Sequence, residues 1–285
     1  MTQGKQTALV LAGGGSFGAV QVGMLRALVA DGLAPDLIVG SSVGAINGAW
    51  FAGAPDAEGV ERLASIWQGL RRREVFAIRW RDLVGLASRR DHIVDPAGLR
   101  ALLERHLRYR QFEQAAVPLH IVATDQLRGH LVRLSSGDIV DAVLASCAVP
   151  AVFPPVRVAN RYLIDGAIAS NTPIRVAGDL GATRIIVLPT GFACALEQPP
   201  TSALGNALHA ITLLIAHQLV DDLESCRQRA EVVIVPPLCP LAVSPYDFSR
   251  AGELIDRASE QTARWLAASR ATQARVPGAL HSHEH

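Results

Sequence analysis

Short apolar runs alternate with longer stretches of helical periodicity along most of this 285-residue chain. Brief apolar runs predict buried strands, whereas apolar residues that recur every three or four positions predict helices. The pattern predicts strands over 7–12, 36–39, 117–124, 130–134, 184–188 and 231–235, and a hairpin of 156–158 with 162–164. It predicts helices over 18–30, 43–52, 57–70, 96–107, 138–148, 173–180, 202–228 and 249–269. This alternation indicates an α/β fold with a mainly parallel central sheet and helices on both faces.

The composition is consistent with one large core. Hydrophobic residues make up 49% of the chain and aromatic residues only 5%, so Ala, Val, Leu and Ile must fill most of the interior. That mixture suits buried parallel strands. We therefore expect a single catalytic domain over residues 1–275, followed by a disordered tail over 276–285. The net charge of +1 gives no general attraction to nucleic acid, and we expect no nucleic-acid partner.

One segment departs from this neutral balance. Residues 71–110 contain eleven arginines and five acidic residues, which is a net charge of +6. Such a run can be a solvated surface, or it can be a patch that contacts anionic lipid headgroups. The sequence leaves both interpretations open.

The remaining signals for location and metal binding are negative. The four cysteines are widely spaced and form no CxxC pair, so we expect free thiols with no disulfide framework, no metal site and no cofactor. The apolar run over 8–12 is too short for a signal peptide. The apolar stretch over 207–220 is interrupted by polar residues and is shorter than the ~20 residues of a membrane span. We expect a cytoplasmic protein without a signal peptide or transmembrane segment.

The clearest chemical motif is Gly40–Gly44, which reads G-S-S-V-G and matches the pattern G-x-S-x-G. A predicted strand precedes it and a predicted helix follows it, which is the context that a nucleophilic serine requires. The turn would present the Ser42 hydroxyl at the carboxyl end of a strand, and its flanking glycines would let strand and helix approach closely. Ser42 is therefore the candidate nucleophile of an esterase.

A glycine-rich loop follows the first predicted strand and opens the first helix. Backbone N–H groups in such a loop can hold the oxyanion of an acyl-transfer intermediate. The same residues, Gly13, Gly15 and Gly18, also satisfy the dinucleotide pattern G-x-G-x-x-G. A dinucleotide site needs an acid at the carboxyl end of the second strand, but Asp36 lies at the start of that strand. This makes dinucleotide binding the weaker alternative.

A serine nucleophile also needs a base within hydrogen-bond reach. His209 and His217 follow Ser42 in the order of an ordinary α/β-hydrolase triad. Both lie in a predicted apolar helix, where a histidine is more often structural. In addition, only one strand precedes Ser42, whereas those hydrolases place several strands before the nucleophile. The sequence pattern alone therefore does not decide the base.

Four motifs together resemble the patatin-like phospholipase family, in the family's order and over residues from about 8 to 190. They are the glycine loop Gly13–Gly18, the nucleophile motif Gly40–Gly44, the Ala-Ser-x-x-x-Pro stretch Ala145–Pro150, and the block Asp165–Ala167. The resemblance implies a patatin-like three-layer sandwich. It also implies a Ser42–Asp165 dyad in which the aspartate replaces histidine as the base, and an oxyanion hole formed by Gly13, Gly14, Gly15 and Ser16.

The resemblance further implies a lipid acyl hydrolase of the phospholipase A or lysophospholipase type. Its substrates would be phospholipids, lysophospholipids or other lipid esters, met through peripheral contact with a membrane. One residue departs from the family's pattern, because Phe17 stands where the glycine loop usually carries Arg or Lys. The loss of that charge puts the rate and the headgroup preference in question. Oligomeric state, acyl-chain length and positional preference are not predicted.

Two further interpretations stay open. The chain could be a non-catalytic member that keeps the fold and binds an acyl group, although it retains both Ser42 and Asp165. The apolar stretch over 203–220 could line an acyl pocket or lie against lipid, or it could simply pack in the core.

Overall fold

A computed structural model describes residues 6–75, 92–191, 228–239, 241 and 247–269, together with the single residues 201, 206, 210, 218, 219, 222, 223 and 226. The strands are β1 (Thr7–Leu11), β2 (Leu37–Ser41), β3 (Leu119–Asp125), β4 (Leu131–Leu134), β5 (Val156–Val158), β6 (Arg161–Ile164), β7 (Arg184–Leu188) and β8 (Glu231–Ile234). The helices are α1 (Gly18–Ala30), α2 (Val43–Ala52), α3 (Ala57–Gly69), α4 (Arg72–Val75), α6 (Ala97–His106), α7 (Ile139–Ser146), α8 (Ala167–Ser170), α9 (Ile174–Asp179) and α11 (Ala251–Ser269), with 3-10 turns η1 (Gly15–Phe17) and η2 (Phe112–Gln114).

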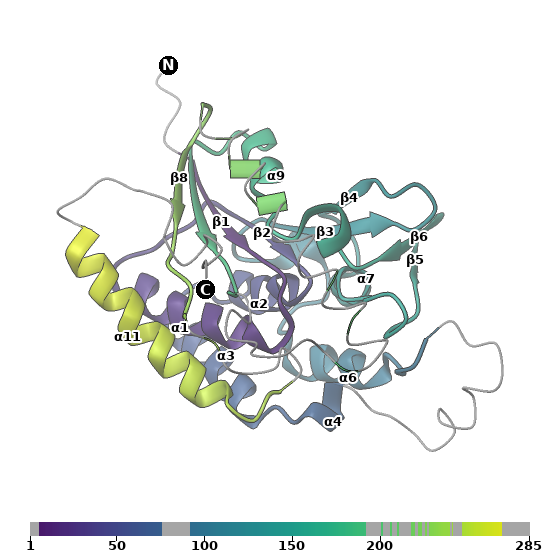
Figure 1. Ribbon diagram of the computed structural model, residues 1–285. Helices are drawn as coiled ribbons and strands as arrows, with labels where there is room; N and C mark the ends of the chain where they lie inside the picture. The colour runs from purple at the N-terminus through teal and green to yellow at the C-terminus, as the bar shows by residue number, and fades with distance from the viewer. Residues whose placement is uncertain are drawn as a thin grey trace.

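The described strands form one eight-stranded sheet in the order β5-β6-β3-β2-β1-β7-β8, and β4 also pairs with β3 (Figure 1). The strands β3, β2, β1, β7 and β8 are parallel to one another. The strands β4, β5 and β6 add an antiparallel region beside β3. The prediction of a mainly parallel sheet is confirmed, and the antiparallel region makes the sheet mixed.

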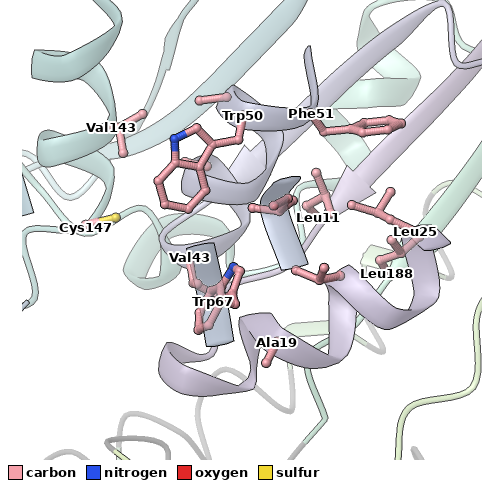
Figure 2. Packing of buried hydrophobic residues seen from close by; sticks show 14 of the residues in the cluster. Leu11, Ala19, Leu25, Val43, Trp50, Phe51, Trp67, Val143, Cys147 and Leu188 are labelled. Atoms are coloured by element: carbon pink, nitrogen blue, oxygen red, sulfur yellow. The ribbon is translucent and has the colours of Figure 1, made fainter. Parts of the chain in front are cut away.

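Apolar side chains cover both faces of the sheet. Leu9 and Leu11 of β1 belong to a large buried cluster with α1, α2, α3, α6, α7 and α11. Their neighbours Ala8 and Val10 belong to a second cluster, on the opposite face, with α9 and with Leu219, Leu223 and Cys226. Successive side chains of a strand point to opposite faces, so one strand supplies both clusters. Helices on both faces of the sheet are thus confirmed, and Figure 2 shows part of the larger cluster around Trp50 and Trp67.

The helix α11 lies along α1, so the last described helix packs on the first (Figure 1). A glycine makes this approach possible. A Cβ atom added to Gly23 of α1 would lie 2.2 Å from the carbonyl oxygen of Ile255 and 2.7 Å from the Cβ of Ala258. No larger residue fits here unless the two helices move apart.

The predicted strands and helices that fall on described residues are confirmed, with boundaries that shift by a few residues. The one-turn helices α4 and α8 were not predicted, because a single turn is too short to show periodicity. The predicted helix over 202–228 and the Arg-rich segment are described only in part, and the tail over 276–285 lies outside the described residues. Among the described helices, none has the length and apolar character needed to cross a membrane.

Candidate active site

Ser42 occupies a sharp turn between β2 and α2. Its backbone angles are φ 53° and ψ −124°, which an L-residue rarely adopts. Close packing holds the turn: a Cβ on Gly40 would lie 2.5 Å from the carbonyl oxygen of Gly44, and one on Gly44 would lie 2.1 Å from that of Leu11. Only glycine fits at both positions. The structure therefore has the strained turn and the close strand–helix approach expected from the motif.

A hydroxyl group from α7 holds the backbone of Ser42. The Ser42 N–H donates to Ser146 Oγ at 2.8 Å, and Ser146 Oγ donates to the carbonyl oxygen of Val122 at 2.6 Å. Ser146 is fully buried, so this pair of bonds ties the turn to β3 away from competing water. Ser146 is the serine of the Ala-Ser-x-x-x-Pro stretch, and the sequence alone predicted no role for it.

Asp165 reaches Ser42 because of the path of β6. Thr124 of β3 pairs with Leu131 of β4 across one edge and with Ile164 of β6 across the other. β2 pairs with this second edge nearer the start of β3. Beyond the end of β2, the same edge of β3 pairs with β6. β2 runs parallel to β3, and β6 runs antiparallel to β3. The carboxyl ends of β2 and β6 therefore face each other. Ser42 Oγ donates a hydrogen bond to Asp165 Oδ2 at 2.8 Å.

The Asp165 carboxyl group is buried, whereas Ser42 is only partly buried. Asp165 Oδ1 accepts from the N–H of Ala167 at 2.8 Å, and Thr124 Oγ1 donates to the Asp165 carbonyl at 2.8 Å. Burial raises the pKa of Asp165 from 3.8 to about 6, and the hydrogen bonds from Ala167 and Ser42 oppose this rise. Asp165 is thus mostly ionised at neutral pH and is a stronger base than an ordinary aspartate.

The glycine loop runs directly beside Ser42. A Cβ on Gly13 would lie 3.2 Å from the Ser42 Cβ, and Gly14 and Gly15 have positive φ values of 153° and 59°. The Gly13 N–H donates to the Asn171 carbonyl at 3.0 Å, so this group anchors the loop. Within the described part of the chain, no hydrogen-bond acceptor is found for the N–H groups of Gly14 and Gly15.

The N–H of Val43, the first residue of α2, likewise has no acceptor among the described residues. It follows the nucleophile at a helix N-terminus, a position that can supply an oxyanion donor. Val43 was not among the predicted oxyanion-hole residues, although its place directly after Ser42 was a signal for it. Ser16, which was predicted to contribute to the oxyanion hole, is 1% exposed in the short helix η1.

A buried polar network fixes both ends of the glycine loop. Gln21 Nε2 donates to the carbonyl oxygens of Ala12 at 2.8 Å and Leu188 at 2.9 Å. Asn47 Nδ2 donates to the carbonyl oxygen of Gly18 at 3.0 Å and to Gln21 Oε1 at 2.9 Å. Trp67 Nε1 completes the chain by donating to Asn47 Oδ1 at 2.8 Å. Ala12 directly precedes the glycine loop and Gly18 ends it, so Gln21 and Asn47 hold the loop in position from within the core.

Phe17 and Cys147 complete the surroundings of the site. The Phe17 side chain is 3% exposed and belongs to the large apolar cluster, so a cation at this position would have to be buried. Cys147 is a buried free thiol. Burial and the charge of Asp165 raise the pKa of this thiol, and the interaction with Ser42 opposes them. Cys147 is therefore a protonated neighbour of the Ser42–Asp165 pair at neutral pH. His209 and His217 lie outside the described residues.

The fold and the site define an α/β protein with a serine–aspartate pair at the carboxyl edge of its parallel strands. The family model for patatin-like phospholipase matches residues 9–177, which is more than half of the chain. This chain belongs to the patatin-like phospholipase family.

Individual relatives agree with the family. The chain is 28% identical over 216 residues to patatin-like phospholipase domain-containing protein 7 of Mus musculus, with 75% of this chain covered. That match spans only 15% of the mouse protein. An uncharacterized NTE family protein of Mycobacterium tuberculosis is 27% identical over 261 residues, which is 84% of this chain and 43% of the relative.

Two solved structures are similar at low sequence identity. VipD from Legionella pneumophila matches with a TM-score of 0.48 and 16% identity, over 93% of this chain and 67% of that one. Human GIVD cytosolic phospholipase A2 matches with a TM-score of 0.47 and 14% identity, over 93% of this chain and 59% of that one.

Proposed function

We propose that this protein is a lipid acyl hydrolase, of the phospholipase A or lysophospholipase type, with Ser42 as nucleophile and Asp165 as base. The observation that carries the proposal is the 2.8 Å hydrogen bond from Ser42 Oγ to a buried carboxylate with a raised pKa. A serine in a strained turn beside a base is the arrangement that nucleophilic catalysis needs. Membership of the patatin-like phospholipase family supports a lipid ester as the substrate.

The reaction would proceed in two halves. In the first, Asp165 takes the proton of Ser42 Oγ, and this oxygen attacks the ester carbonyl carbon. The N–H groups of Gly14, Gly15 and Val43 stabilise the negative charge on the carbonyl oxygen. The ester C–O bond then breaks, and Asp165 returns the proton to the leaving alcohol. In the second half, Asp165 takes a proton from a water molecule, whose oxygen attacks the carbonyl carbon of the acyl-serine. The bond from this carbon to Ser42 Oγ then breaks, Asp165 returns the proton to Ser42 Oγ, and the fatty acid is released.

The proposal also includes where the enzyme meets its substrate. A lipid ester resides in a membrane or in an aggregate, so the enzyme must reach it at that surface. We therefore propose peripheral membrane contact and a single catalytic domain over residues 1–275. The chain spans only 15% of the mouse relative and 43% of the Mycobacterium tuberculosis relative.

The direct test is labelling with a fluorophosphonate probe, which reacts with activated serines. The wild type should label and should hydrolyse a short-chain nitrophenyl ester, and Ser42→Ala should do neither. Ser41→Ala is the matched control, because the Ser41 hydroxyl is fully buried without a hydrogen-bond partner among the described residues. It should label like the wild type. Labelling that survives in Ser42→Ala would disprove the nucleophile.

The assignment of the base needs separate variants. Asp165→Asn should slow labelling and hydrolysis by orders of magnitude, whereas His209→Ala and His217→Ala should change both little. Loss of activity in a folded histidine variant would instead favour a histidine-based triad. A folded wild type that neither labels nor hydrolyses esters would favour the non-catalytic, acyl-binding alternative.

A further inference from the structure

A cavity lies apart from Ser42, between the carboxyl ends of α2 and α6 and one side of α3. Its volume is about 360 Å³, which falls in the range of small-molecule sites. Trp50 lines it from α2, eight residues after Ser42, which corresponds to about 12 Å along a helix. Neither Ser42, Asp165 nor the glycine loop contributes to its lining.

The charged residues that line this cavity are all basic. Arg62 comes from α3, Arg105 from the last turn of α6, and Arg108 from the segment after α6. Within the described part of the chain, neither Arg105 nor Arg108 forms an ion pair, and both are exposed. Arg62 pairs with Glu58 at 2.7 Å, but the Glu58 side chain is 80% exposed, so water weakens that pair.

Stabilisation of the α6 helix dipole explains only some of the basic residues that line the cavity. Basic side chains in a last helical turn interact favourably with the helix dipole, and Arg105 and His106 occupy that turn. Arg62 and Arg108 lie outside it. Burial and the nearby charge of Arg105 lower the pKa of His106, so the three arginines carry the positive charge at neutral pH. They converge on one cavity from two different elements.

The other walls of the cavity are apolar. Leu63 is 1% exposed, Leu107 7% and Trp50 9%, so these side chains form a floor beneath the arginines. The Trp50 indole packs edge-on against the His106 ring, with centroids 6.5 Å apart. Its Nε1–H is buried and has no acceptor among the described residues.

We propose that this cavity binds an amphiphilic anion, a carboxylate or phosphate group that carries an alkyl chain. The anionic group would lie among Arg62, Arg105 and Arg108, and the first part of the chain would lie against Trp50, Leu63 and Leu107. The site would give a function to Arg105 and Arg108, two of the eleven arginines in the segment over 71–110. The inference depends on the cavity alone and not on the proposed hydrolase activity.

Binding is measured by calorimetry with monomeric dodecanoate, dodecyl phosphate and the uncharged dodecanol. The wild type should bind both anions and bind dodecanol at least about tenfold more weakly. Arg105→Ala/Arg108→Ala should weaken anion binding at least about tenfold, because it removes two of the three charged donors that would hold the anionic group. Arg157→Ala/Arg161→Ala removes two exposed arginines from the β5–β6 hairpin and is the matched control. It should bind like the wild type.

The location is checked by fluorescence. A bromine-substituted dodecanoate should quench tryptophan emission of the wild type, and Trp50→Phe should lose most of that quenching. Co-sedimentation with phosphatidylcholine vesicles, with and without phosphatidic acid, then separates the two sources of the anion. Binding of monomeric dodecanoate assigns a free fatty acid, and binding only to phosphatidic acid vesicles assigns a lipid headgroup.

Three results would overturn the proposal. The first is a wild type that binds neither the monomeric anions nor the anionic vesicles. The second is a folded Arg105→Ala/Arg108→Ala variant with wild-type affinity, since the anion would then bind elsewhere, for example beside Ser42. The third is dodecanol binding as tight as that of dodecanoate, because the positive charge of the arginines would then contribute nothing to the affinity.

Discussion

At the scale of single residues, Asp165 combines two properties that oppose each other. Burial makes its ionised form unfavourable, and the hydrogen bonds from Ala167 and Ser42 recover only part of that loss. The result is a carboxylate that is charged at neutral pH and still attracts a proton. The same burial that would make Asp165 a useful base must therefore destabilise the folded protein.

Asp165→Asn should abolish activity and at the same time stabilise the fold at neutral and alkaline pH. The rise of the pKa from 3.8 to about 6 corresponds to about 3 kcal/mol against the charged form in the folded state. As pH rises from about 4 to about 6, the unfolded chain loses this proton first, so the wild type loses stability and the variant does not. Denaturant unfolding should show the variant more stable by up to about 3 kcal/mol at about pH 8 and no more stable at about pH 4.

A variant that is equally stable or less stable at alkaline pH would contradict this picture. It would mean that the Asn amide makes poorer contacts with Ser42 and Ala167 than the carboxylate does. The variant Asp36→Asn tests whether the effect is specific, because this aspartate accepts from the Thr7 N–H at an exposed position. Removing the Asp36 charge should give no stabilisation at pH 8.

How much of the site the sequence predicts depends on how local the signal is. Ser42 and Asp165 belong to short motifs on predicted strand ends, so their approach could be expected before the structure was known. Gln21 and Asn47 were not predicted, because each is a single polar residue among apolar neighbours in its helix. Their partners lie on other elements, and no local pattern reveals such contacts.

At the scale of elements, the glycine loop has few side chains of its own to hold it. Its conformation depends on the residues around it: Thr190 Oγ1 donates to the Gly13 carbonyl at 2.6 Å, and Gln21 and Asn47 fix its two ends. A loop that presents bare N–H groups to a reacting oxygen must not move when charge develops there. We therefore regard Gln21 and Asn47 as positioning residues for the oxyanion hole.

Gln21→Met keeps the size of the side chain and removes its hydrogen bonds to Ala12, Leu188 and Asn47. We expect kcat to fall about 10- to 100-fold with little change in KM, because a shift of about 1 Å in catalytic groups has effects of that size. Binding of a trifluoromethyl ketone, which mimics the oxyanion, should weaken in parallel with kcat. Stability should fall by about 1–3 kcal/mol, since the buried Ala12 carbonyl and the Asn47 amide each lose the hydrogen bond to Gln21.

The control for this variant is Tyr109→Phe. It removes another buried hydrogen bond to the core, from Tyr109 Oη to the Ala49 carbonyl at 2.6 Å, at the far end of α2. It should reduce stability and leave kcat unchanged. If Gln21→Met likewise loses stability but keeps its kcat and its affinity for the ketone, the network is structural only.

The elements themselves were predicted well, because alternating and helical periodicities are local properties of the sequence. The antiparallel region was less predictable. A hairpin over 156–158 and 162–164 was expected, but nothing local indicates that β6 pairs with β3 beyond the end of β2. That pairing depends on residues about 40 positions apart, Thr124 and Ile164, and it is what brings Asp165 to Ser42.

At the scale of the whole molecule, the close packing of α1 and α11 connects the beginning and the end of the described fold. Gly23→Ala should destabilise the protein by about 1–3 kcal/mol, even though alanine favours helices more than glycine does. The added methyl group would press on the backbone of Ile255, which cannot rotate away. Gly69→Ala, in α3, meets no atom within 4 Å and is the matched control.

Thermal unfolding of the two variants decides this prediction. Gly69→Ala should leave stability unchanged or raise it by up to about 1 kcal/mol. A Gly23→Ala protein that unfolds at the wild-type temperature would show that α11 can move away without loss, and the closing helix would then contribute little to the stability of the sheet.

The meeting of β2 and β6 also determines when the protein becomes reactive. Ser42 and Asp165 are 123 residues apart, and the loop between them must close before the hydroxyl gains its base. Contacts of such long range form late in folding. During synthesis, Ser42 leaves the ribosome well before Asp165 exists as part of the chain. If Ser42 and Asp165 act as the proposed pair, a nascent or half-folded chain gains an activated serine only once β6 has paired with β3.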